Sequence, residues 1–152
     1  MNYYRRTRLA QLAVLSLVTL VSLVTLAATA RAQISLSSLK GRWAMSLVGF
    51  TGCGQQSIYA TFKLDGTGSG MATVQFHGQC HDSTSADLPF VIQSLNPDGS
   101  GRANLSCGTG CGWNLIIQVA KDGQVFSVVD VDPVNPGNFL AGTAVRQIDV
   151  GF

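Results

Sequence analysis

The chain of 152 residues contains no glutamate, so all eight of its acidic residues are aspartates. Charged residues make up only 12% of the chain, whereas about 25% is usual in soluble proteins. Most of the aspartates fall in turns and connections, where a carboxylate usually accepts hydrogen bonds from nearby backbone N–H groups. The sequence therefore does not predict a pair of catalytic carboxylates facing a cleft.

Histidine is also scarce, because the chain has only His77 and His81. Together with Cys80 and Asp82 they form a dense cluster of potential metal ligands, but a zinc site needs three or four deprotonated ligands and the chain has no Cys-x-x-Cys pair. A nucleophilic serine or cysteine would need a histidine base that a third group holds in place. We predict no metal, no cofactor and no enzymatic activity; free thiols would make zinc the alternative.

Basic residues are few outside the N-terminus. Residues 1–32 carry four of the ten Lys and Arg and no acidic residue, so the other 120 residues hold six basic (10 − 4) and eight acidic groups, a net charge near −2. Nucleic-acid binding needs a basic face. The sequence therefore argues against a nucleic-acid partner.

The N-terminus has the three parts of a signal peptide. Basic residues up to Arg8 precede an apolar run from Leu9 to Ala28, and Ala30-Arg31-Ala32 matches the site that signal peptidase cleaves. We predict a signal peptide over 1–32 and one domain over 33–152 that is secreted or periplasmic and has no membrane attachment after cleavage. The alternative is an uncleaved membrane anchor, since the apolar run is just long enough to span a bilayer.

All four cysteines, Cys53, Cys80, Cys107 and Cys111, lie in the part predicted to be exported. An even number of cysteines in an oxidising compartment predicts two disulfides, for which three pairings exist. We favour Cys53 with Cys80 and Cys107 with Cys111, because the second pair flanks a Gly-Thr-Gly connection at facing hairpin positions.

The predicted domain alternates apolar and polar residues with the period of two that is typical of strands. In one segment Ile58, Ala60, Phe62 and Leu64 share a face. No stretch after residue 40 has a helical period. The strands are predicted at roughly 42–50, 56–64, 70–78, 88–95, 101–107, 112–120, 124–131 and 138–147.

Tight Asp-Gly turns follow the second, fourth and sixth predicted strands, at Asp65-Gly66, Asp98-Gly99 and Asp122-Gly123. The other connections are longer or irregular: those after the first, third and fifth strands contain the cysteines or adjoin them, and the one over 132–137 contains two prolines. In an antiparallel meander these two groups of connections lie at opposite ends. We predict an all-β fold, an eight-stranded antiparallel up-and-down β-barrel that disulfides staple at one end, since closure removes exposed sheet edges.

The segment Leu39-Lys40-Gly41-Arg42-Trp43 opens the first strand and resembles the Gly-x-Trp motif of the calycin superfamily, which includes lipocalins, avidins and fatty-acid-binding proteins. The resemblance implies a barrel closed by Gly41, Trp43 and a basic residue from the last strand, which here is Arg146. The chain is also similar, more weakly, to the small periplasmic metalloprotease inhibitors of bacteria, which are disulfide-bearing barrels with the same Gly-x-Trp start.

Two binding functions are compatible with this fold. The first is a non-catalytic, monomeric binding protein of lipocalin-like architecture that takes a small apolar ligand at the barrel mouth. The second is a protein-binding barrel, of the protease-inhibitor or adhesion type, with a filled interior and working loops. The bulky inward residues favour a small or closed cavity. The candidate lining residues are Phe62, Phe76, Phe90, Leu105 and Trp113.

Overall fold

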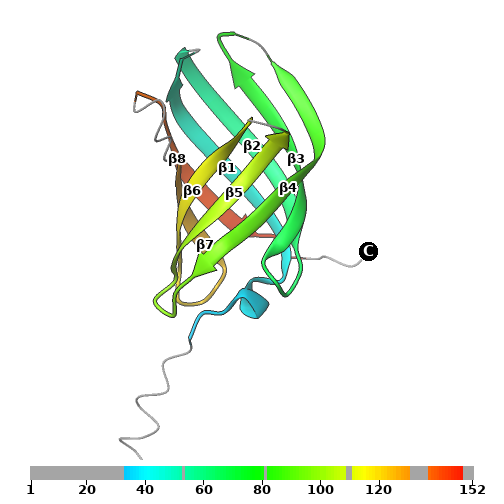
Figure 1. Cartoon of the computed structure of the whole chain (residues 1–152), viewed down its shortest axis with the longest axis vertical. Helices are drawn as coiled ribbons and strands as arrows, with labels where there is room; N and C mark the ends of the chain where they lie inside the picture. The colour runs from blue at the N-terminus through cyan, green and yellow to red at the C-terminus, as the bar shows by residue number, and fades with distance from the viewer. Residues whose placement is uncertain (1–32, 53, 81, 109–110, 131–136, 149–152) are drawn as a thin grey trace, which may run out of the picture. The chain divides into compact units, whose positions relative to one another are not determined.

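The computed structural model describes residues 33–148 apart from 53, 81, 109–110 and 131–136. Each strand pairs antiparallel with the next, and the last strand returns to the first, so the sheet closes into a barrel (Figure 1). The prediction of an all-β, eight-stranded, up-and-down barrel is confirmed. The elements are the 3-10 helix η1 (Leu36–Leu39) and strands β1 (Gly41–Thr51), β2 (Gly54–Leu64), β3 (Ser69–Gly78), β4 (Ser83–Leu95), β5 (Ser100–Gly108), β6 (Cys111–Val119), β7 (Val125–Asp130) and β8 (Phe139–Arg146).

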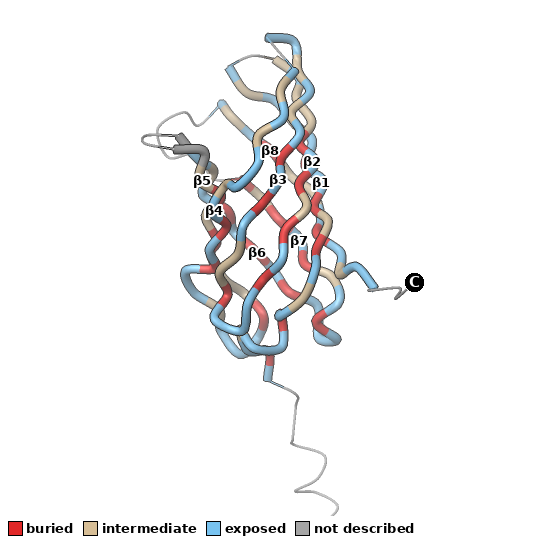
Figure 2. The backbone as a smooth tube through the Cα atoms, turned by 90° about the vertical axis from the view of Figure 1, so that its right-hand side faces the viewer, coloured by how far each residue is buried: buried red, intermediate tan, exposed pale blue. Residues whose placement is uncertain are grey.

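Alternation along the strands separates the core from the outer wall. In β2, Ile58, Ala60, Phe62 and Leu64 are buried, and Tyr59 between the first two is exposed. Figure 2 shows the same alternation of buried and exposed positions around the barrel. The core therefore lies inside the barrel, and the outward-facing residues of each strand form its outer wall.

Strand β4 differs from its prediction, because it begins at Ser83 and not near residue 88. The register between β3 and β4 shifts between Ala72 and Val74, and Asp87 adopts a positive φ of 58°. Such a bulge interrupts the period of two. The polar start of the strand consequently reads as a loop in the sequence.

One end of the barrel, which we call the turn end, carries the three short turns. The Asp65 carboxylate accepts hydrogen bonds from the Thr67 amide at 2.8 Å and the Ser69 amide at 3.0 Å, and Asp98 likewise accepts one from the Ser100 amide at 2.9 Å. These bonds lower the pKa of both carboxyl groups; the largest contribution comes from the Thr67 hydroxyl at Asp65 and from the Ser100 hydroxyl at Asp98.

The N-terminal segment of the domain covers the turn end. Leu39 is fully buried and Ile34 nearly so. Gly68 and Gly99 both have φ near +88°, and a Cβ on them would lie 2.9 Å from Leu36 Cδ2 and 3.1 Å from Ile34 Cδ1. Glycine is therefore needed in these turns both for the backbone conformation and for the close approach of the N-terminal segment.

The opposite end, which we call the cysteine end, carries the connections after β1, β3, β5 and β7. At the β5–β6 hairpin Cys111 pairs with Gly108, and the register shifts between Ser106 and Gly108. The expectation that Cys107 and Cys111 occupy facing positions is therefore wrong, because an extra residue is accommodated on β5. The side chains of both cysteines, and Cys53 altogether, lie outside the described residues.

Candidate functional site

Aromatic side chains fill the half of the barrel that is nearer the turn end. The Phe62 and Phe90 rings stack with their centroids 4.3 Å apart, and the Trp43 and Phe126 centroids are 4.8 Å apart. Phe62 and Phe126 join the two pairs at 6.4 Å. Of the predicted lining residues, Phe62 and Phe90 thus belong to a packed cluster and have no more than 4% of their surface exposed.

The residues predicted to close the barrel meet at the turn end. Trp43 and Arg146 are opposite each other in the β1–β8 register, and the Arg146 guanidinium carbon lies 5.2 Å from the centroid of the Trp43 ring. Arg146 Nη2 also donates a hydrogen bond to the backbone oxygen of Ser38, and Trp43 Nε1 donates one to the backbone oxygen of Leu39 at 2.9 Å. A Cβ on Gly41 would be 4.0 Å from Arg146 Nε.

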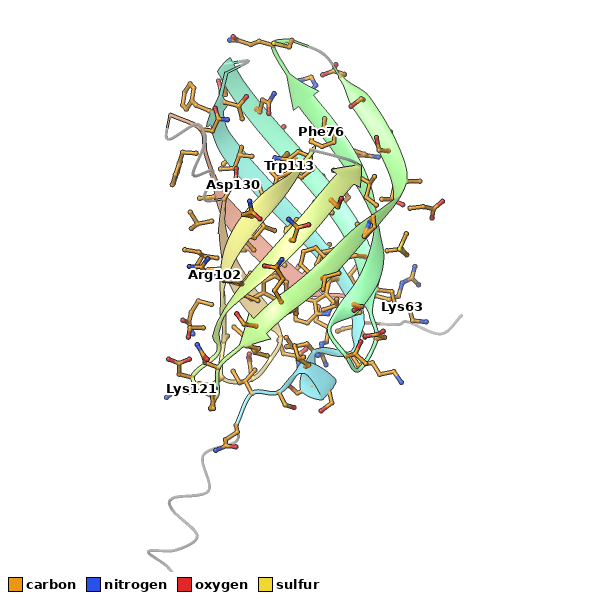
Figure 3. The ribbon with its side chains drawn as sticks, viewed as in Figure 1. Lys63, Phe76, Arg102, Trp113, Lys121 and Asp130 are labelled. Atoms are coloured by element: carbon orange, nitrogen blue, oxygen red, sulfur yellow. The ribbon has the colours of Figure 1, made fainter. Side chains whose placement is uncertain are left out.

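The other candidate lining residues lie towards the cysteine end. Phe76 and Trp113 have ring centroids 5.1 Å apart and are only partly buried, whereas Leu105, opposite Trp113 in the register, is fully buried. Figure 3 places Phe76 and Trp113 with Asp130 in the half of the barrel away from Lys121. We call the three residues Phe76, Trp113 and Asp130 the mouth.

Asp130 is the single charged residue that is buried in the described part of the chain, with 6% of its surface exposed. Asp130 pairs with Leu115 on β6. Trp113 lies two residues before Leu115, and therefore on the same face of that strand. Most aspartates were predicted to lie in turns and connections, but Asp130 is the last residue of β7. Its burial depends on the end of β7 continuing the inward face of the barrel, and only the alternation with Phe126 and Val128 could have indicated this.

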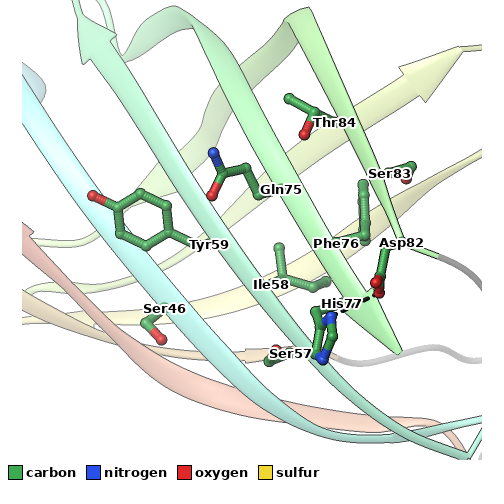
Figure 4. Close-up of a pocket in the computed structure, with 10 residues that line it drawn as sticks. All are labelled: Ser46, Ser57, Ile58, Tyr59, Gln75, Phe76, His77, Asp82, Ser83 and Thr84. Carbon is green, nitrogen blue, oxygen red and sulfur yellow. Dashed lines mark ion pairs between the residues drawn. The ribbon is translucent and has the colours of Figure 1, made fainter. Parts of the chain in front are cut away.

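The outer wall over β1 to β4 carries two adjoining hollows that share Ser57 and His77. Their volumes are about 600 Å³ and about 460 Å³. We call the two together the outer groove, and Figure 4 shows the larger hollow. The larger is lined by Ser46, Ser57, Ile58, Tyr59, Gln75, Phe76, His77, Asp82, Ser83 and Thr84, and the smaller by Val48, Gln55, Gln56, Ser57, His77, Gly78 and Gln79.

An ion pair lies in the outer groove, where His77 Nδ1 is 2.7 Å from Asp82 Oδ1. Ser57 is opposite His77 in the β2–β3 register, so a serine, a histidine and an aspartate are neighbours. Nucleophilic catalysis requires the serine hydroxyl to be hydrogen-bonded to the histidine. Among the described residues Ser57 has no such bond, and the His77 and Asp82 side chains are 80% and 64% exposed. The arrangement is a solvated ion pair and not an assembled catalytic triad.

Within the described ranges, no three His, Cys, Asp or Glu side chains are grouped so as to hold a metal ion. His81 of the predicted ligand cluster lies outside those ranges. The same part of the chain contains no free cysteine, and this includes Cys80. It also contains no helix with the length and hydropathy needed to cross a membrane.

The chain matches no protein family and no curated protein. The closed eight-stranded antiparallel barrel is consistent with a calycin-like fold.

Proposed function

We propose that residues 33–152 form an exported, monomeric, non-catalytic binding protein of calycin-like architecture, secreted or periplasmic, with two disulfides at the cysteine end. The stacking of Arg146 on Trp43 between the first and last strands supports the calycin-like assignment. The lack of a free cysteine in the described residues supports the disulfides. The small negative net charge of this segment supports a partner other than nucleic acid.

The ligand that we propose is a small apolar molecule seated on Phe76 and Trp113. The observation that carries this proposal is the contrast in burial along the barrel. The aromatic rings towards the turn end are buried in a packed cluster, whereas the Phe76 and Trp113 rings lie beside each other and are partly exposed. Ligand pockets combine apolar walls with a few polar groups that orient the ligand. Asp130 is a buried polar residue at the mouth.

Titration with an apolar fluorescent probe, N-phenyl-1-naphthylamine, tests this proposal. We expect saturable binding that Phe76→Ala weakens about tenfold, as the loss of about 1.4 kcal/mol of apolar contact predicts. The matched control is Phe139→Ala, which removes an exposed ring on the outer wall and should leave binding unchanged. If the probe does not bind, or binds equally to the Phe76 variant, the mouth is not a ligand site.

A protein partner is the second candidate, and a different observation favours it. Phe50 and Phe139 are opposite each other in the β1–β8 register and are 62% and 54% exposed, and Val48 beside them is 58% exposed. Grouped exposed apolar side chains mark interaction surfaces. We call these three residues the rim patch.

The weaker resemblance to metalloprotease inhibitors suggests the test for the rim patch. Inhibition of a panel of purified metalloproteases should be lost in the double variant Phe50→Ser, Phe139→Ser, and probe binding at the mouth should persist. If the unsubstituted protein inhibits none of them, the inhibitor form of this candidate is wrong.

Export and oxidation have direct measurements. The intact mass of the exported protein should correspond to a chain that begins at Gln33, and retention of residues 9–28 would contradict the signal peptide. Peptide mapping without reduction should recover Cys53 linked to Cys80, and Cys107 linked to Cys111. Free thiols in the exported protein would contradict the disulfides.

A further inference from the structure

The outer groove adjoins both sites above, through Phe76 of the mouth and Val48 of the rim patch, but it differs from them in chemistry because uncharged hydrogen-bonding side chains dominate it. Apart from the His77–Asp82 pair, its lining has no acidic or basic side chain. Amide and hydroxyl groups supply the rest of its polarity. A third hollow at the turn end, which Arg42 and Lys63 line, shows that other parts of the same wall are charged.

Asp82 accepts a hydrogen bond from the Gly78 amide at 3.3 Å, but the uncharged polar side chains at the centre of the groove are not used to hold the barrel together. Within the described part of the chain, the side chains of Ser46, Tyr59 and Gln75 make no hydrogen bond to protein atoms. Two amides elsewhere on the outer wall are occupied: the Asn104 amide nitrogen donates to the Trp113 oxygen at 3.2 Å, and that of Gln118 donates to the Asp98 oxygen at 3.0 Å. The groove therefore presents donors and acceptors that a ligand can take over from water.

Tyr59 lies at the centre of this surface. The register places it between Ser46 on β1 and Gln75 on β3, and Gln75 in turn faces Thr84 on β4 (Figure 4). Tyr59 is 42% exposed. Neighbouring strands are about 4.8 Å apart, so polar side chains recur on either side of the ring at a spacing of about one sugar residue.

This combination matches the chemistry of a neutral carbohydrate. A pyranose ring presents an apolar C–H face, which stacks on an aromatic ring, and a rim of hydroxyls that pair with amides and hydroxyls. Anionic ligands are usually bound by arginine or lysine, which the groove lacks, and apolar ligands bind in pockets with a largely apolar lining. The two hollows run on from each other through Ser57 and His77, which suits several linked sugars rather than one.

We propose that the outer groove binds a neutral oligosaccharide, with Tyr59 as the stacking platform and with Ser46 and Gln75 as its hydrogen-bonding neighbours. His77 adds a hydrogen-bonding group, because its Nδ1 is held by Asp82 and its Nε2 is left for a sugar hydroxyl. The groove shares Phe76 with the mouth and Val48 with the rim patch, but the three residues that carry this proposal, Tyr59, Ser46 and Gln75, belong to neither, so it does not depend on a ligand at the mouth or on a partner at the rim patch.

The test begins with the exported protein on an array of neutral and acidic glycans. Neutral oligosaccharides that bind are then measured by calorimetry as free hexasaccharides. We expect binding to at least one neutral glycan, with an affinity that is the same in low and high salt, because no net charge is neutralised. Binding to no glycan, or to acidic glycans only, would overturn the proposal.

Matched variants locate the site. Tyr59→Ala and Gln75→Ala should each weaken binding at least tenfold, and Tyr59→Phe, which keeps the stacking ring, should bind within about threefold of the unsubstituted protein. Met71→Ala is the control, because Met71 is an exposed residue of β3 that lines the charged hollow and not the groove. Unchanged binding in a folded Tyr59→Ala variant, or an equal loss in the Met71 variant, would overturn the assignment to the groove.

Discussion

Replacement of Arg146 by alanine tests how the barrel is closed. The change removes the cation–π contact between the guanidinium and the Trp43 ring, whose centroid is 5.2 Å away; such a contact contributes about 1–2 kcal/mol when it is partly desolvated. It also removes the charged hydrogen bond to the Ser38 backbone oxygen, which contributes about 1.5–3 kcal/mol. The same substitution also removes one destabilising feature of the folded protein, which offsets part of this loss. Arg146 Nε is buried with no hydrogen-bond acceptor among the described residues, and its removal relieves a cost of about 1–3 kcal/mol. The net expectation is a loss of about 1–3 kcal/mol in the free energy of unfolding.

Urea unfolding measures this loss in a Trp113→Phe background, where Trp43 is the only indole left. The fully buried Trp43 should emit further to the red in the alanine variant, because the guanidinium no longer covers its ring. Arg146→Lys should give an intermediate loss, since lysine keeps the charge but not the planar fork. Lys121→Ala, in the exposed β6–β7 turn, is the control and should change stability by no more than about 0.5 kcal/mol. Equal midpoints for the Arg146→Ala and Lys121→Ala variants would refute the stacked closure.

Three further predictions concern packing and pH. Gly142→Ala would put a Cβ 1.8 Å from the Ser46 backbone oxygen, so it should lower the free energy of unfolding in urea by about 3 kcal/mol or more. The control Gly66→Ala, whose Cβ would have no atom within 4 Å, should change it by no more than about 0.5 kcal/mol. Comparable losses in the two variants would contradict the close approach of β1 and β8. Phe126→Ala should cost about 3–5 kcal/mol because it opens a cavity between Trp43 and Phe62, and a small loss in the same assay would show that the interior is not packed as described. The pKa values of Asp65 and Asp98 are lowered in the folded protein, so the unfolded chain binds protons first as the pH falls. Both carboxylates therefore stabilise the barrel above about pH 4, near the ordinary aspartate pKa of 3.8. This stabilisation is lost as the pH falls through the pKa values of the folded protein. The double variant Asp65→Asn, Asp98→Asn should make the urea midpoint depend less on pH below about pH 4, and an unchanged acid slope would contradict this role.

The architecture could be predicted because its determinants are local. A strand exposes alternate residues to opposite sides, so the sequence around Phe62 already separates an inner from an outer face. Turn chemistry is local too, since the Asp65 carboxylate bonds to amides within four residues of it. Eight such strands with no helical segment between them leave closure of the sheet as the economical way to remove its edges.

Register and bulges were not predictable in the same way. A bulge depends on how two strands fit against each other, and the one near Asp87 conceals the first residues of β4 in the sequence. The same reason accounts for the offset of Cys107 from Cys111 at the β5–β6 hairpin. A one-residue change in register moves every following side chain to the other face, and the sequence of one strand alone does not carry this information.

The sequence alone determined the inner and outer faces of most strands, the turn end and the cysteine end, because each follows from residues close together in the chain. Only the tertiary structure decided which side chains meet. Phe62 and Phe90 stack because β2 and β4 curve around the same interior, and Asp130 is buried because it lies on the inward face of β7. Ser46, Tyr59 and Gln75 form one surface because three strands are in register. These contacts join residues 13 or more positions apart, as the pair Ser46–Tyr59 shows, and their formation depends on the closure of the whole sheet.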